Sequence, residues 1–163
     1  MTRSPSELSS SELNALTYDA EIVGYGEKGK VTTKIRQTPN VGVRTTSGFL
    51  VGSSRGEWGG ELIYLAGKSP QVRLIDENIT GIHPHALGTV VVTGLAHLGL
   101  NAGALYLAKL VRPGKYDVSR WKTLPGAPRR SGVMPDGSLF VSCEGGDIVL
   151  KADGRMEMAV RAP

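Results

Sequence analysis

The chain has 163 residues, of which 40% are apolar and 22 are glycine, and its formal net charge is +4. This length supports one domain with a real core, and the apolar content excludes a disordered chain. No apolar run is long enough to cross a bilayer and the first residues lack the apolar stretch of a secretion signal, so we expect a cytoplasmic protein without membrane contact. The single cysteine, Cys143, cannot form an internal disulfide, which agrees with a reducing compartment.

Two regions are expected along the chain. Residues 1–17 are rich in serine and are predicted to form a flexible arm, although Ser9 and Glu12 have the spacing of a capping box and could start a short helical turn. Residues 18–163 are predicted to form a single all-β domain. Its first element is a hairpin over residues 20–36, because β-branched residues flank a turn that contains a glycine.

Three similar units follow the hairpin, and each consists of a strand, a loop and a second strand that starts near a glycine. These glycines, Gly60, Gly103 and Gly146, recur at equal intervals. A strand repeat of about 40 to 50 residues is typical of propeller blades. The paired strand segments are expected at residues 49–53 and 62–65, 88–94 and 102–108, and 138–143 and 145–151. The prolines of residues 125–128 are expected to stop regular structure before the third unit.

The second and third units are each preceded by an apolar residue, a proline and a glycine turn. The two segments are Ile82-His-Pro-His-Ala-Leu-Gly88 and Val133-Met-Pro-Asp-Gly137. Together with the strands that start near a glycine, these segments resemble β-propeller repeats over roughly residues 43–160. The resemblance implies an all-β fold of propeller-like antiparallel sheets, with three clear blades and a partial amino-terminal one. It points to no specific family and implies no functional residue.

The open edges of such a set of blades could be closed in more than one way. Three blades alone leave open sheet edges, so we expect either that the amino-terminal hairpin completes a four-bladed ring or that two chains combine. An ordinary antiparallel sandwich or barrel is the alternative fold, because the same alternation of apolar residues would serve it.

In a propeller-like fold the loops within the units gather at one rim, where binding is expected. The loop of residues 56–60 places Glu57 and Trp58 between glycines, which allow a sharp turn and expose the residues between them. The corresponding loop of the next unit carries His97. We therefore expect a partner-binding rim, with Arg55, Glu57, Trp58, His97 and Asn101 as its candidates. The alternative is a structural loop, in which Trp58 packs over the sheet edge and Glu57 caps a turn.

A metal site is a second hypothesis. His83 and His85 would point to one face of a strand, and with His97 and Glu57 they could hold the metal of a hydrolase or lyase. Pro84 indicates a turn between the first two histidines, however, so turn or packing roles are favoured and no cofactor is expected.

A basic patch supports a third hypothesis, polyanion or nucleic-acid binding. Its candidates are Arg120, Lys122, Arg129 and Arg130. Only Tyr116 and Trp121 add aromatic surface to this cluster, and the sequence contains no recognisable motif for reading nucleic-acid bases. We therefore favour the interpretation that these charges form an ordinary solvent-exposed face.

No set of residues forms a convincing nucleophilic centre. Cys143 lies in an apolar strand, where burial is expected to raise the pKa of its thiol and make it inert. Ser53 and Ser54 would need a base that the sequence does not show. We therefore favour a non-catalytic protein-binding module, such as a bacterial inhibitor or immunity protein that blocks a toxin. A protein partner is favoured over nucleic acid, and the protein is expected to be a monomer or homodimer.

Overall fold

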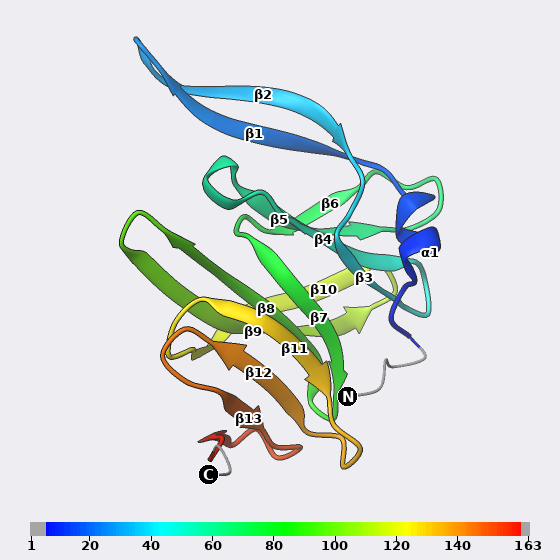
Figure 1. The fold of residues 1–163 in the computed structure, drawn as a ribbon. Coiled ribbons are helices and arrows are strands. Elements are labelled where there is room, and N and C mark those ends of the chain that lie inside the picture. The colour runs from blue at the N-terminus through cyan, green and yellow to red at the C-terminus, as the bar shows by residue number, and fades with distance from the viewer. Residues whose placement is uncertain (1–5, 161–163) are drawn as a thin grey trace.

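A computed structural model describes residues 6–160, and the strands in this part of the chain form four antiparallel sheets (Figure 1). The first sheet is a hairpin of β1 (Tyr18–Gly26) and β2 (Gly29–Gln37). Three four-stranded sheets follow, in which strands that are neighbours in the chain pair with one another, and we call them blades 1, 2 and 3. Blade 1 comprises β3 (Val41–Arg44), β4 (Phe49–Ser54), β5 (Gly60–Leu65) and β6 (Val72–Ile75). Blade 2 comprises β7 (Ile79–His85), β8 (Gly88–His97), β9 (Leu100–Arg112) and β10 (Lys115–Thr123), and blade 3 comprises β11 (Pro128–Val133), β12 (Leu139–Cys143), β13 (Ile148–Leu150) and β14 (Met156–Met158).

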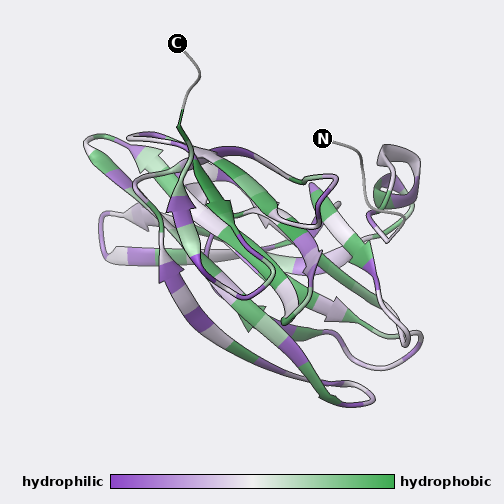
Figure 2. Cartoon of the chain, turned by 90° about the horizontal axis from the view of Figure 1, so that it is seen from below, coloured by the Kyte–Doolittle hydropathy of each residue, from purple (hydrophilic) through white to green (hydrophobic). Residues whose placement is uncertain are grey.

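The sheets stack face to face in chain order, with an apolar layer at each interface. Successive side chains of a strand point to opposite faces, so a sheet packed on both sides must be apolar on both. Leu50 and Leu62 of blade 1 share a buried cluster with Val91 of blade 2. The opposite face of blade 2 shares another with Leu139 and Ile148 of blade 3. Figure 2 shows the hydrophobic residues concentrated along the stacked strands.

The all-β prediction and the three repeated units are confirmed, each unit having four strands, and the arrangement is consistent with a propeller-like fold. The hairpin contributes Tyr18 and Ala20 to an apolar layer on the outer face of blade 1. Figure 1 shows the hairpin and blade 3 at opposite ends of the stack, so the hairpin does not complete a four-bladed ring. The reason is that blade 1 lies between the hairpin and blade 2, and within residues 6–160 no further sheet follows blade 3.

Two of the three repeated glycines, Gly60 and Gly103, lie where the chain passes from one blade to the next. A Cβ on Gly60 would lie 2.6 Å from the Cα of Asn78, in the linker that enters blade 2. A Cβ on Gly103 would lie 2.4 Å from the carbonyl oxygen of Gly126, in the linker that enters blade 3. Both distances are too short for real side-chain contacts, so glycine is required for the linker to cross the strand. Gly60 and Gly103 therefore meet the same packing requirement in blades 1 and 2, whereas Gly146 lies in the turn between β12 and β13, with a φ of 141°.

The amino-terminal segment differs from the flexible arm that we expected for residues 1–17. Residues 1–5 lie outside the described part of the chain, whereas residues 6–17 pack against blade 1. Leu8 and Leu13 are buried in the layer shared with the hairpin. The backbone N–H of Leu8 also donates to the carbonyl oxygen of Gly42 in β3, at 2.9 Å. The segment therefore covers an edge of blade 1 that would otherwise be open.

The expected capping box is present at the start of α1 (Ser10–Asn14). Ser9 Oγ accepts a hydrogen bond from the backbone N–H of Glu12 at 3.1 Å, and Glu12 Oε2 accepts one from the N–H of Ser9 at 2.6 Å. Packing of Leu13 adds the tertiary support that a helix this short needs. No helix within residues 6–160 is both long and apolar enough to span a membrane.

Two strands were not predicted because they contain prolines. Pro84 lies within β7, where a turn was expected, and Pro128 begins β11, where regular structure was expected to stop. Each is the first strand of its blade and has a neighbour in its own sheet on one side only. A proline is tolerated there because it removes a donor from an edge that makes no ladder hydrogen bond. The prediction of a turn between His83 and His85 was therefore wrong.

We predict that Gly103→Ala lowers the free energy of unfolding by about 1–3 kcal/mol, because the added methyl group forces the linker away from β9. Gly24→Ala is the matched control, since its Cβ would meet no atom closer than 3.9 Å. Urea denaturation followed by circular dichroism measures both changes. Equal stability of the two variants would contradict the crossing requirement.

Candidate functional site

Two loops of neighbouring blades meet on one side of the stack. The first is the short 3₁₀ turn η1 (Gly56–Trp58) between β4 and β5, and the second is the turn between β8 and β9. Their exposed side chains form what we call the loop rim: Glu57, Trp58, His97, Leu98 and Leu100. The three apolar members have exposed fractions of 49% for Trp58, 92% for Leu98 and 52% for Leu100. The rim therefore presents apolar surface to solvent.

An ion pair joins the two loops of the rim. Glu57 Oε2 lies 2.9 Å from His97 Nε2, so blades 1 and 2 are linked at this side. Both side chains remain partly exposed, and Trp58 lies beside the hairpin, where a Cβ on Gly24 would be 3.9 Å from its ring. Glu57, Trp58 and His97, which the sequence placed at one rim, are thus close together in the structure.

A cleft of about 450 Å³ lies beside the rim, between η1, the β6–β7 linker and the β8–β9 strands. Its charged lining contains three carboxyl groups and one guanidinium, those of Glu57, Asp76, Glu77 and Arg120. Leu95 and Leu100 form an apolar part of the wall of the cleft. The cleft is therefore locally acidic, although the whole chain carries a net charge of +4.

Tyr106 donates its hydroxyl hydrogen to Glu77 Oε1 at 2.5 Å, close to this cleft. Burial of the phenol, together with the hydrogen bond and charge of Glu77, raises the pKa of Tyr106 to about 12. The hydroxyl is therefore neutral at physiological pH and holds the Glu77 carboxylate in place.

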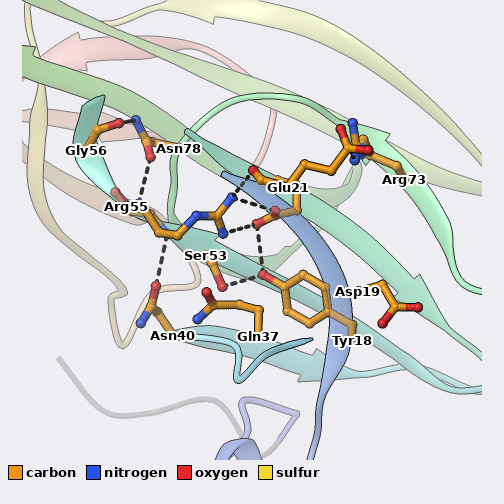
Figure 3. Close-up of polar contacts among 12 residues, drawn as sticks. Tyr18, Asp19, Glu21, Gln37, Asn40, Ser53, Arg55, Gly56, Arg73 and Asn78 are labelled. Atoms are coloured by element: carbon orange, nitrogen blue, oxygen red, sulfur yellow. Dashed lines mark hydrogen bonds and ion pairs between the residues drawn. The ribbon is translucent and has the colours of Figure 1, made fainter. Parts of the chain in front are cut away.

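Arg55 is a structural residue and does not belong to the exposed rim. Its side chain is only 12% exposed, and its guanidinium forms two hydrogen bonds of 2.8 Å with Glu61, which is 2% exposed (Figure 3). The same guanidinium donates to the carbonyl oxygen of Glu21 in β1 at 3.0 Å. The hydrogen bond to Glu61 raises the pKa of Arg55, so this buried guanidinium stays charged.

Tyr18 completes this buried polar network from the hairpin. Its hydroxyl donates to Glu61 Oε2 at 2.8 Å and lies 2.5 Å from Ser53 Oγ. Burial raises the pKa of the Tyr18 phenol, and Glu61 adds to that effect, so Tyr18 remains a neutral donor. Because Tyr18 and the Glu21 carbonyl belong to β1, the network fastens the hairpin to blade 1 (Figure 3).

Two asparagines fix the linkers beside the site. Asn78 Oδ1 accepts from the backbone N–H of Arg55 at 3.0 Å, and its Nδ2 donates to the carbonyl oxygen of Gly56 at 2.8 Å. These bonds set the shape of η1. Asn101, a candidate rim residue, accepts from the backbone N–H of Ala127 at 2.6 Å and holds the linker to blade 3. Asn101 therefore supports a linker as Asn78 does, although Asn101 is exposed and Asn78 is buried.

The three histidines of the metal hypothesis have separate partners. His85 Nε2 lies 2.9 Å from the carbonyl oxygen of Lys151, and its ring meets the edge of Trp121. His97 pairs with Glu57, and His83 has the partners described below. Within residues 6–160 no three histidine, cysteine or acidic side chains gather in a way that could hold a metal ion.

The basic residues of the nucleic-acid hypothesis are divided between β10 and β11. Arg120 lines the acidic cleft, and Lys122 Nζ lies 5.3 Å from the centre of the Trp121 ring. Arg129 pairs with Glu144 at 2.6 Å, while Arg130 is exposed. Three of these four side chains thus have contacts within the protein.

The sequence did not indicate one trio of polar side chains, in which His83 is buried and Glu7 and Ser131 are partly buried. His83 Nδ1 lies 2.8 Å from Glu7 Oε1, and His83 Nε2 lies 2.6 Å from Ser131 Oγ. The three residues come from the amino-terminal segment, β7 and β11 respectively. They are 76 and 48 positions apart in the chain, so no local motif could have identified them.

Comparisons with known proteins found no matching family, no similar curated protein and no similar solved structure.

We predict that Glu61→Gln lowers the free energy of unfolding by about 3–5 kcal/mol, because the buried Arg55 charge loses its counter-ion. Tyr18→Phe should cost about 1–2 kcal/mol, since it removes hydrogen bonds of a neutral hydroxyl. The control is Asp19→Asn, which breaks an ion pair with Arg36 whose side chains are 74% and 60% exposed and should change stability by less than about 1 kcal/mol. Denaturant titration of the three variants measures their losses of stability, which should decrease from Glu61→Gln to Tyr18→Phe to Asp19→Asn. An equal loss in all three variants would contradict this ranking.

We also predict that Cys143 reacts slowly with thiol reagents in the native protein. Burial of the thiol, with the nearby charge of Asp147, raises its pKa to about 11. A rise of about two units leaves roughly a hundredfold less thiolate at pH 8. The rate with Ellman's reagent, measured in native and urea-unfolded protein, should differ by at least that factor, and equal rates would show that the thiol is accessible.

Proposed function

We propose that this protein is a protein-binding module that engages its partner through the loop rim, without catalysis at that surface. The observation that carries the proposal is the conformation of Leu98. Leu98 and Gly99 form the two-residue turn between β8 and β9, with φ angles of 45° and 88°. Such turns favour asparagine or glycine, and a left-handed conformation costs other residues about 1–2 kcal/mol.

The folded chain gains little from a leucine at this position. Leu98 is 92% exposed, so its side chain buries almost no apolar surface that could offset the strain of the turn. Backbone strain of this kind, where no internal contact requires it, supports a role outside the monomer. Contact with a partner would bury Leu98 together with Trp58 and Leu100, and a cluster with an aromatic anchor is typical of the centre of a protein interface.

The neighbouring cleft indicates the chemistry of the partner. Three carboxyl groups against one guanidinium favour a basic side chain, and Leu95 and Leu100 would contact its aliphatic stem. We therefore propose a partner that presents a lysine or arginine surrounded by apolar residues. An inhibitor or immunity protein that covers a basic surface of a toxin would act in this way.

Leu98→Asn provides the test, because its effects on folding and binding should be opposite. Asparagine tolerates the left-handed conformation, so we predict that the free energy of unfolding rises by about 1 kcal/mol. Loss of the apolar side chain should weaken partner binding at least tenfold, which corresponds to about 1.4 kcal/mol. Affinity capture from the native host, followed by titration with the identified partner, measures binding, and urea denaturation measures stability.

Val111→Thr is the matched control, since Val111 is 61% exposed at the opposite end of β9. It should leave capture unchanged, whereas Trp58→Ala should weaken capture as Leu98→Asn does. A partner that binds the two rim variants as tightly as the unmodified protein would refute the proposed surface.

A further inference from the structure

We propose that Ser131, His83 and Glu7 form an acyl-transfer site for esters of short aliphatic acids, separate from the loop rim. The geometry is that of a nucleophile, a base and a carboxylate in series. Ser131 Oγ is 2.6 Å from His83 Nε2, and His83 Nδ1 is 2.8 Å from Glu7 Oε1. A hydroxyl within hydrogen-bond reach of a base that a third group orients defines an activated serine on any fold.

The carboxylate of Glu7 selects the tautomer of the neutral imidazole. A carboxylate can only accept a hydrogen bond, so His83 Nδ1 must carry the hydrogen that it donates to Glu7. In the neutral imidazole Nε2 is then the acceptor, and Ser131 must donate its hydroxyl hydrogen to it. This tautomer and this direction are the ones that a serine nucleophile requires.

The surrounding backbone holds the imidazole and the hydroxyl together. A Cβ on Gly81 would lie 2.4 Å from Ser131 Oγ and 2.7 Å from His83 Nε2, so glycine in β7 leaves the space that both groups occupy. His83 is only 6% exposed, which restricts the rotation of its ring. Glu7 is the positioning residue, and pairing of the neighbouring Leu8 with β3 fixes its place.

A cavity of about 220 Å³ adjoins the three side chains. Its wall includes the apolar side chains of Leu8, Leu13, Val41 and Ile82. This volume is below the roughly 300–1,000 Å³ of pockets for drug-sized ligands, so it suits a short acyl chain. Asn40 and Thr80 add polar groups to the wall, and the apolar part of the wall offers a place for an aliphatic acyl chain.

The reaction needs no further reagent than water. Ser131 Oγ forms a bond to the ester carbonyl carbon while its proton passes to His83 Nε2, and the bond from that carbon to the alcohol oxygen breaks as the alcohol takes the proton from His83. Water then attacks the acyl-serine, again giving a proton to His83, which returns it to Ser131 Oγ. The products are one carboxylic acid and one alcohol.

Diethyl fluorophosphate is the probe for the nucleophile, because attack by Ser131 forms a phosphorus–oxygen bond and expels fluoride. We expect peptide mass spectrometry of the full-length protein to locate the diethylphosphoryl adduct on Ser131. The adduct should be absent in Ser131→Ala and should form about a hundredfold more slowly in His83→Gln, since a general base contributes about 10²–10⁴-fold. Hydrolysis of p-nitrophenyl acetate should fall in parallel in both variants.

Ser119→Ala, an exposed serine on β10, is the matched control and should leave labelling and hydrolysis unchanged. Circular dichroism establishes that each variant is folded, and Ser131→Ala decides the matter if His83→Gln does not fold. Absence of an adduct on Ser131 in the folded unmodified protein overturns the proposal, as does equal hydrolysis by the folded Ser131→Ala variant. Leu98→Asn should retain labelling, so this site and the rim can fail independently.

Discussion

Burial of sheet faces against one another is the constraint on which the rest of this structure depends. Blade 1 is covered by the hairpin on one face and by blade 2 on the other. Blade 2 in turn lies between blade 1 and blade 3. Face-to-face packing at close spacing leaves little room where the chain passes between blades, and Gly60 and Gly103 provide that room. The loops at the ends of the strands are consequently held on a rigid stack, which is the usual basis for binding by loops.

Inside this apolar stack, buried polar groups position the exposed ones. Arg55 and Glu61 neutralise each other beneath η1, while Asn78 ties the same turn to the linker of the next blade. Removing one member would leave a buried charge or an unpaired polar group, which is more costly than the net gain from forming the pair. The network therefore acts mainly to specify where Glu57 and Trp58 lie, beside the acidic cleft.

The two proposed sites differ in how the fold supports them. At the rim, Leu98 is strained and exposed, so the monomer loses stability that a partner could restore. Along the first strands of the blades, His83 is buried and fully engaged, so Ser131 is held ready without any partner. A stabilising substitution is therefore expected to harm the first site, whereas the second depends on the stability of the stack.

Much of the fold could be predicted because its signals are local. Alternating apolar residues indicated the strands of the hairpin and of the three units, and the spacing of Ser9 and Glu12 indicated the capping box. Expectations failed where an environment decided the outcome. Pro84 lies in a strand because that strand has an open edge, and Leu8 and Leu13 are buried because blade 1 offers them an apolar face.

The sequence by itself determined the hairpin, the paired strands of each repeated unit and the meeting of Glu57, Trp58 and His97, because alternating apolar residues and turn glycines are local signals. Only the tertiary structure decided that Arg55 pairs with Glu61, that Asn101 bonds the linker to blade 3, and that Glu7, His83 and Ser131 come within hydrogen-bond distance. These outcomes depend on contacts between segments far apart in the chain, whose burial and distance no local pattern encodes.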